Sequence, residues 1–228
     1  TVMVAEAIGK TSFPAKGPVH INIPLKEPLY PNTLSTKELL TLQKSILKWL
    51  NQHVYKAIDK ISDKDFSQLE QAWVGSSKKM ILIGQGAMHE KWIKLKEQGD
   101  VVILADVASN KHSMANVAAF DKLISAANPP LLKSLSPDLL LSFGGPVLSK
   151  SLKNWLKQLK PQWHFRIQQE PELVNTYGNV TQVLKAGVDE TLQQIAAIRW
   201  NKKAETSFVD AWKNADEKIT KKITDFAS

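Results

Sequence analysis

Three short turns are the segments of this chain whose residue types could hold a ligand. Gly84-Gln85-Gly86, Ser109-Asn110 and Gly144-Gly145 each follow a run of mainly apolar residues. Such runs are typical of buried strands in a parallel sheet, and open sheets of this kind bind ligands beyond the carboxyl ends of their strands. Lys150 would add a positive charge where the next helix starts and its backbone N–H groups point outward. The pattern predicts that the turns converge on a crevice for a small anionic ligand, with an empty crevice as the alternative.

The first of these turns also suggests a dinucleotide site. In GQGAMHEK, Gly84 and Gly86 occupy the first two glycine positions of the G-x-G-x-x-G pattern, and Asp106 follows at a distance that suits contact with a ribose hydroxyl. The third position holds His89, where the pattern needs a glycine so that the helix can pack closely. A tight turn is therefore the favoured interpretation, and a Rossmann-like domain that binds NAD, FAD or ADP stays open as the alternative function.

Other patterns of catalysis are missing from the sequence. The chain has no cysteine, which excludes disulfides, thiolate metal sites and a cysteine nucleophile. Its histidines show no metal-binding spacing, and neither a Gly-x-Ser-x-Gly elbow nor a Walker loop occurs. We interpret each histidine as solvated or held in the core. We therefore predict no catalytic, cofactor-binding or metal-binding residue within this chain.

The net charge of +8 comes almost entirely from lysine, since Arg166 and Arg199 are the only arginines. Recognition of bases and phosphates relies on the arginine fork, and the lysines are spread over predicted helices, so we expect no nucleic-acid partner. No run approaches the roughly 18 apolar residues that cross a membrane. The start, TVMVAEAIGK, also lacks the pattern of a signal peptide. We expect a cytoplasmic protein without a membrane span.

Residues 1–34 precede the main predicted domain. Within them, residues 2–8 predict the end of a helix, and residues 19–24 alternate apolar and polar side chains as a strand does. Prolines at positions 24, 28 and 31 then interrupt regular structure and indicate a linker. Ser35 and Glu38 have the spacing of a capping box, which predicts that a new helix and a new domain begin there.

Residues 35–200 predict an α/β domain. After two helices, the apolar runs KKMILI, VVILAD and DLLLSF alternate with amphipathic helices, and QWHFRIQ and TQVLKA predict two further strands. Short buried strands that alternate with helices form right-handed crossovers, so we predict a parallel, Rossmann-like sheet flanked by helices. Residues 201–228 predict a last amphipathic helix that leads out of this domain.

The segment GPVHINIPLKEPLYPN resembles a known domain junction. In thiamine-diphosphate enzymes, a G-P-V-x-[IL]-x-[IVC]-P sequence forms the last strand of the domain that binds the pyrimidine ring of the cofactor. The following KEPLYP is similar to the 2-succinyl-5-enolpyruvyl-6-hydroxy-3-cyclohexene-1-carboxylate synthases of menaquinone biosynthesis. The later segments ILIGQGAMHE, ILADVASNKH and PDLLLSFGGPVLSKSLKNWL resemble the central domain of that family in order and spacing. Residues 170–175 depart from the aspartate-rich turn of many members.

This resemblance implies a role for each part of the chain. Residues 1–34 would be the tail of the pyrimidine-binding domain, residues 35–200 the central domain, and residues 201–228 a helix leading to the diphosphate-binding domain. The family's catalytic glutamate would lie upstream and its Gly-Asp-Gly motif downstream, so this segment alone would be inactive.

The resemblance also implies the parent activity. The parent would be a homo-oligomeric transferase that uses thiamine diphosphate and Mg²⁺ or Mn²⁺. It would decarboxylate 2-oxoglutarate and add the succinyl unit to isochorismate, with the carbanion chemistry supplied by the cofactor. In such a parent, the central crevice would bind a small anionic aromatic effector of the pathway or stay empty.

Overall fold

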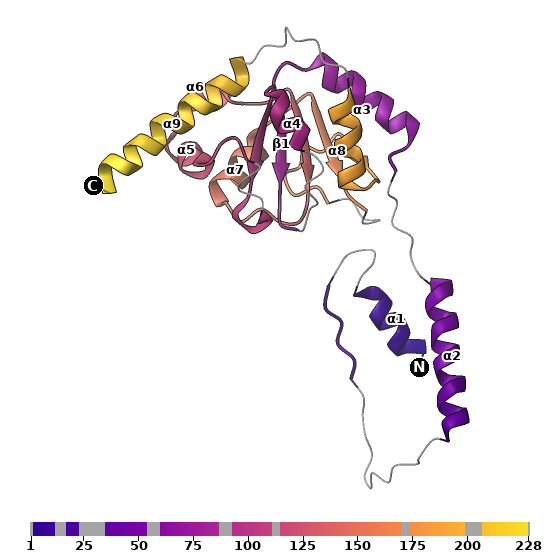
Figure 1. Cartoon of the computed structure of the whole chain (residues 1–228). Helices are drawn as coiled ribbons and strands as arrows, with labels where there is room; N and C mark the ends of the chain where they lie inside the picture. Colours follow the sequence, from indigo (N-terminus) through magenta and orange to yellow (C-terminus); the bar gives the residue numbers. More distant parts are fainter. Residues whose placement is uncertain are drawn as a thin grey trace. The chain divides into compact units, whose positions relative to one another are not determined.

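The computed structural model describes residues 2–11, 17–22, 35–53, 60–86, 93–110, 115–169, 174–198 and 207–227. These residues belong to two compact units. One unit holds the first two helices, and the other holds the sheet with the helices that cover it (Figure 1).

The first unit is formed by α1 (Val2–Lys10) and α2 (Thr36–His53), which pack against each other. The predicted capping box begins α2: the Ser35 N–H donates to Glu38 Oε2 at 2.8 Å, and the Glu38 N–H donates to Ser35 Oγ at 3.4 Å. These bonds satisfy N–H groups that have no partner within the helix, which fixes where α2 starts. This helix, which the sequence placed in the central domain, thus lies with α1.

The predicted strand over residues 19–24 is not formed in the part that the structure describes. Residues 17–22 adopt neither helix nor strand, and residues 23 and 24 lie outside the described ranges. Alternation of apolar and polar side chains predicts which faces a strand would have, but a strand also needs a neighbour that accepts its backbone hydrogen bonds.

The second unit is built on a five-stranded sheet in which every neighbouring pair is parallel. The strands are β1 (Lys79–Ile83), β2 (Val101–Ala105), β3 (Leu139–Phe143), β4 (Trp163–Ile167) and β5 (Gln182–Leu184). Their order is β2-β1-β3-β4-β5, so the chain leaves β1 toward one edge and later returns to its other side. The predicted parallel, Rossmann-like α/β fold is confirmed, and its switch point lies between β1 and β3.

Helices cover both faces of this sheet (Figure 1). One core lies under α3 (Asp63–Gly75), α4 (Ile93–Gln98) and α8 (Val188–Ala197). The other lies under α5 (Phe120–Ala126), α7 (Lys150–Gln158) and α9 (Ser207–Ala227), with α6 (Pro129–Ser134) directly after α5. Because both faces are buried, β1, β2 and β3 consist entirely of buried residues, which explains their near-continuous apolar sequences.

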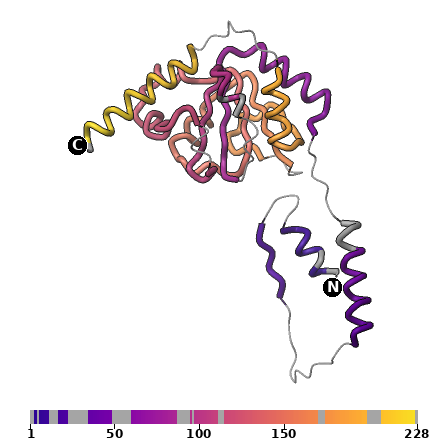
Figure 2. The backbone as a smooth tube through the Cα atoms, viewed as in Figure 1, coloured from indigo at the N-terminus to yellow at the C-terminus, as the bar shows by residue number. Residues whose placement is uncertain are grey.

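The first half of α9 is part of this domain. Phe208, Val209 and Trp212 are buried in the second core, and the Trp212 indole N–H donates to the Leu135 carbonyl at 3.1 Å. Its last turns are exposed and extend beyond the sheet (Figure 2). The boundaries 1–34, 35–200 and 201–228 stay a prediction about the parent protein. Among the described helices, none is long and apolar enough to cross a membrane.

Candidate functional site

The turns after β1 and β3 meet at the switch point of the sheet. The Gly84 N–H donates to the Phe143 carbonyl at 2.9 Å, and the Gly145 N–H donates to the Gln85 carbonyl. The Gln85 N–H in turn faces the Pro146 carbonyl at 3.4 Å. Backbone hydrogen bonds therefore join the two turns directly.

The glycines are needed because the two turns approach so closely. A Cβ added to Gly84 would lie 2.1 Å from the carbonyl oxygen of Gly145. A Cβ on Gly144, whose φ of +83° disfavours other residues, would lie 2.9 Å from the carbonyl oxygens of Gly84 and Gln85. Gly84 and Gly144 thus serve contact between turns rather than the approach of a pyrophosphate. Gly86 is exposed, and a Cβ there would meet open space.

Asp106, the residue that would bind a ribose, points instead into the protein. It is 1% exposed, and its Oδ1 accepts the Ala108 N–H at 3.0 Å. Its Oδ2 accepts the N–H groups of Leu148 and Ser149 at 3.0 and 3.3 Å. The carboxylate therefore ties the end of β2 to the segment that enters α7, and its acceptor positions are used within the chain.

A second carboxylate lies at the start of α7. Asp121 of α5 accepts hydrogen bonds from the hydroxyl groups of Ser149 and Ser151, and these bonds hold the pKa of Asp121 below its usual range. Ser149 also caps the helix, because its Oγ accepts the Leu152 N–H at 3.1 Å. Lys150 is the first residue of α7 and is exposed. The carboxylates of Asp106 and Asp121 thus already lie at the N-terminus of α7, where the helix dipole favours negative charge.

The third predicted turn follows β2 and contains a short 3₁₀ helix, Val107–Ser109. Ser109 is buried, and its hydroxyl donates to the Asp106 carbonyl at 2.6 Å. Asn110 is exposed with a φ of 55°, the left-handed conformation that asparagine tolerates. The structure therefore places Ser109 as a support of Asp106 and leaves Asn110 at the surface.

In these turns, backbone N–H groups thus donate hydrogen bonds to carbonyl and carboxylate oxygens of the chain itself. Whether the crevice binds a ligand stays a prediction. His89, His112, Arg199 and residues 23–34 lie outside the described residues. Within the described ranges, no group of three histidine, aspartate or glutamate side chains is placed to hold a metal ion.

A buried polar chain, which the sequence did not reveal, lies beneath the second core. His164 of β4 is fully buried, and its Nε2 lies 2.7 Å from the hydroxyl of Ser142 on β3. Its Nδ1 lies 2.7 Å from Asn179 Oδ1, while the Asn179 amide donates to the carbonyls of Leu156 and Leu159. Because Asn179 presents its oxygen, the network assigns the proton to Nδ1 and makes Nε2 the acceptor for Ser142.

These three residues have the order of a nucleophile, a base and an orienting group, but not the exposure that catalysis needs. Ser142 and His164 are 1% and 0% exposed. Burial lowers the pKa of His164 to about 4, and burial raises the pKa of Tyr177, which stacks on His164 at 6.4 Å, to about 12. We conclude that the Ser142–His164–Asn179 chain joins β3, β4 and the loop before β5 as a structural element.

A buried ion pair lies near the opposite, amino-terminal edge of the sheet. Lys79 begins β1 and pairs with Asp100, which precedes β2, and both side chains are less than 5% exposed. The Lys79 ammonium also lies 5.3 Å from the centre of the Trp73 ring. The pair therefore joins β1, the start of β2 and α3, and it lies at the edge where this class of sheet does not bind ligands.

The chain is similar to curated proteins over nearly all of its length. It is 30% identical over 216 residues to the 2-succinyl-5-enolpyruvyl-6-hydroxy-3-cyclohexene-1-carboxylate synthase of Bacteroides thetaiotaomicron. The aligned region covers 93% of this chain and 37% of that protein. The synthase of the same name from Desulfotalea psychrophila is 32% identical over 191 residues, with 82% of this chain and 33% of that protein covered. No protein-family model matches the chain.

The fold and these similarities place the chain in two steps. The parallel five-stranded sheet with helices on both faces defines a Rossmann-like α/β protein. Within that class, the chain is a relative of the 2-succinyl-5-enolpyruvyl-6-hydroxy-3-cyclohexene-1-carboxylate synthases, so the resemblance stated from the sequence is confirmed. The chain spans about 37% of the length of the first two relatives.

Proposed function

We propose that this chain is the central, non-catalytic domain of a thiamine-diphosphate-dependent synthase. The observation that carries the proposal is the sequence similarity along 93% of the chain to about 37% of the synthases of Bacteroides thetaiotaomicron and Phocaeicola vulgatus. In this proposal, the parent decarboxylates 2-oxoglutarate and adds the succinyl unit to isochorismate. It works as a homo-oligomer, and thiamine diphosphate with Mg²⁺ or Mn²⁺ is held by its flanking domains.

The geometry of the switch point supports a structural role for this segment. Gly84 and Gly144 lie in close contact with neighbouring backbone atoms. Asp106 accepts hydrogen bonds from backbone N–H groups of the chain. A dinucleotide would need Asp106 to turn toward its ribose and the turn after β1 to admit its pyrophosphate. Both changes would break hydrogen bonds that join the turns, which disfavours NAD, FAD or ADP as a ligand.

The direct test uses the full-length protein that contains this segment. With thiamine diphosphate and Mg²⁺, it should consume 2-oxoglutarate only when isochorismate is present, and mass spectrometry should detect the succinylated product. Omission of the cofactor or the metal should abolish the product. A full-length protein that takes neither substrate would contradict the proposed activity.

The second arm uses the 228-residue chain alone. It should show no decarboxylation under the same conditions and no saturable binding of NAD, FAD or ADP by calorimetry. Turnover by the isolated chain would overturn its assignment as a non-catalytic domain. Micromolar NAD binding would instead favour the nucleotide-binding alternative.

A further inference from the structure

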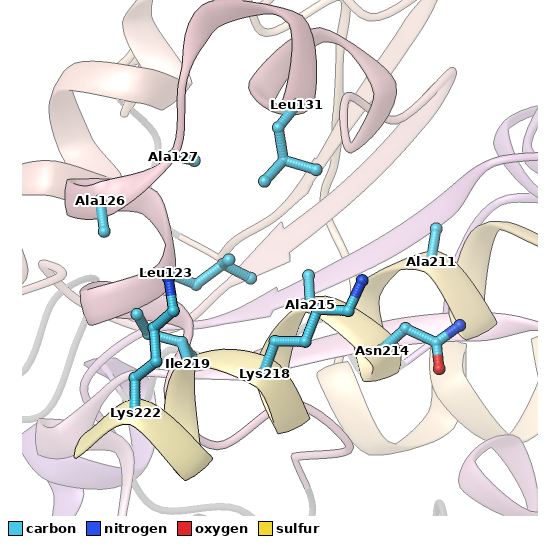
Figure 3. A pocket seen from close by; sticks show the side chains of 10 residues that line it. All are labelled: Leu123, Ala126, Ala127, Leu131, Ala211, Asn214, Ala215, Lys218, Ile219 and Lys222. Carbon is cyan, nitrogen blue, oxygen red and sulfur yellow. The ribbon is translucent and has the colours of Figure 1, made fainter. Parts of the chain in front are cut away.

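A hollow on the second core face lies between α9 and the α5–α6 segment, away from the turns at the switch point. Its volume is about 290 Å³, just below the roughly 300 Å³ at which pockets for drug-sized ligands begin. Leu123 and Leu131 line one side, and Ile219 lines the other (Figure 3). Small side chains explain why the hollow exists, because alanines at positions 126, 127, 211 and 215 leave the space between the helices unfilled.

The apolar part of this groove is entirely aliphatic. Its lining contains leucine, isoleucine and alanine side chains and no aromatic ring. Aromatic ligands gain part of their binding energy from stacked or edge-to-face ring pairs, and the groove offers no ring for either. An alkyl chain needs only apolar contact and suits this lining better.

Two lysines give the groove a positive rim. Lys218 and Lys222 are one helical turn apart on α9, and both side chains rise from α9 toward α5 and α6 (Figure 3). Among the residues that the structure describes, neither ammonium lies within ion-pair distance of a carboxylate. The nearby Asp216 is already engaged, because its carboxylate accepts the N–H groups of Ala118 and Ala119 at 3.0 and 2.7 Å. Asp216 thus fixes α9 on the start of α5.

We propose that this groove binds a medium-chain alkyl carboxylate, such as a free fatty acid with about eight carbons. The alkyl chain would lie among the leucine, isoleucine and alanine side chains, and the carboxylate would lie between Lys218 and Lys222. The aliphatic lining selects the chain, the paired ammonium groups select the anionic head, and the small volume limits the length of the ligand.

The experiment titrates the 228-residue chain with sodium octanoate and follows the methyl NMR signals of the groove alanines. Saturable shifts of Ala126, Ala127, Ala211 and Ala215 are expected, with octanol and 1-naphthoate binding more weakly than octanoate. Replacement of both lysines, K218Q/K222Q, should weaken octanoate about tenfold and leave octanol unchanged, since each of the two exposed ion pairs with lysine contributes up to about fivefold.

A matched double variant, K213Q/K221Q, removes two exposed lysines of α9 that do not line the groove and should bind octanoate like the wild type. Ala215→Leu should fill the groove and abolish binding of both probes. Equal affinities for octanoate and octanol in the wild type, or no loss in K218Q/K222Q, would overturn the assignment of an anionic head. Tighter binding of 1-naphthoate would overturn the alkyl assignment. Alanine shifts that depend on protein concentration without a ligand would show that a second copy covers the groove.

Discussion

Protonation of His164 should destabilise the domain at mildly acidic pH. Its imidazole is fully buried between Ser142 and Asn179, and its pKa falls from 6.5 in the unfolded chain to about 4 in the folded one. The native state therefore holds His164 neutral in a range where the unfolded chain binds a proton. The contribution of neutral His164 to the free energy of unfolding is fully present above pH 6.5 and is lost as the pH falls from 6.5 toward 4.

The size of this effect follows from the shift in pKa. A difference of one pKa unit corresponds to about 1.4 kcal/mol, so the cost should reach about 2 to 3 kcal/mol at a pH near 4.5. Many carboxylates titrate in the same range, so the wild type alone cannot isolate the effect. His164→Gln removes the titrating group, and it should lower stability at neutral pH by about 1 to 3 kcal/mol because buried partners lose hydrogen bonds.

The assay is urea unfolding followed by tryptophan fluorescence, in which Trp155 and Trp212 of the second core report on this domain. Between pH 7.5 and about pH 4.5, the difference in unfolding free energy between the wild type and His164→Gln should shift by about 2 to 3 kcal/mol in favour of the variant, which closes or reverses the gap. His20→Gln, at an exposed position of the first unit, should leave the wild-type pH profile unchanged. Parallel loss of stability in the wild type and His164→Gln would refute the reasoning.

Three further substitutions test how the sheet edges are held, each by the urea midpoint. Gly84→Ala should cost at least about 2 kcal/mol because its Cβ would overlap a backbone carbonyl, whereas Gly75→Ala, where no atom lies within 4 Å, should be neutral or slightly stabilising. Asp106→Asn should cost about 1 to 3 kcal/mol, since an amide donor would face the backbone N–H groups that the carboxylate accepts. Lys79→Met should cost about 3 to 5 kcal/mol by leaving Asp100 buried without its cation, and adding Asp100→Leu should recover most of it. Equal costs for the two glycine variants, an unaffected Asp106→Asn, or no recovery in the Lys79 and Asp100 double variant would contradict the respective argument.

Local patterns in the sequence were enough to predict the layered fold. The apolar runs at residues 79–83, 101–105 and 139–143 mark strands that are buried on both faces, and the helices between them require parallel crossovers. Convergence of the turns that follow these strands is a consequence of that topology. Ser35 and Glu38 of the capping box are only three positions apart, so the local sequence is enough to predict it.

The partners of the polar groups were not predictable in the same way, because they are distant in the sequence. Asp106 reaches backbone groups 42 and 43 residues further on, and Asp121 reaches hydroxyl groups 28 and 30 residues further on. His164 meets Ser142 and Asn179 only because β3 and β4 are neighbours and a loop folds over them. Residue type suggested ribose binding for Asp106, whereas its contacts in the fold define a structural role.

The switch point of the sheet and the groove beside α9 differ in which charged groups they contain, and this difference bears on where a ligand can bind. At the switch point, an incoming anion would meet the start of α7 beside Asp106 and Asp121, two carboxylates that already accept the available donors. A like charge nearby disfavours a second anion, and the positive groups at this point include the exposed Lys150 and the Arg166 guanidinium, which already donates to the Gly144 carbonyl. In the groove beside α9, Lys218 and Lys222 adjoin an aliphatic lining, and the carboxylate of Asp216 accepts N–H groups at the start of α5. The residue types that suggest a ligand site at the switch point are thus used to join the sheet. Lys218 and Lys222, which form no ion pair among the described residues, lie on a helix that the sequence predicted only to lead out of the domain.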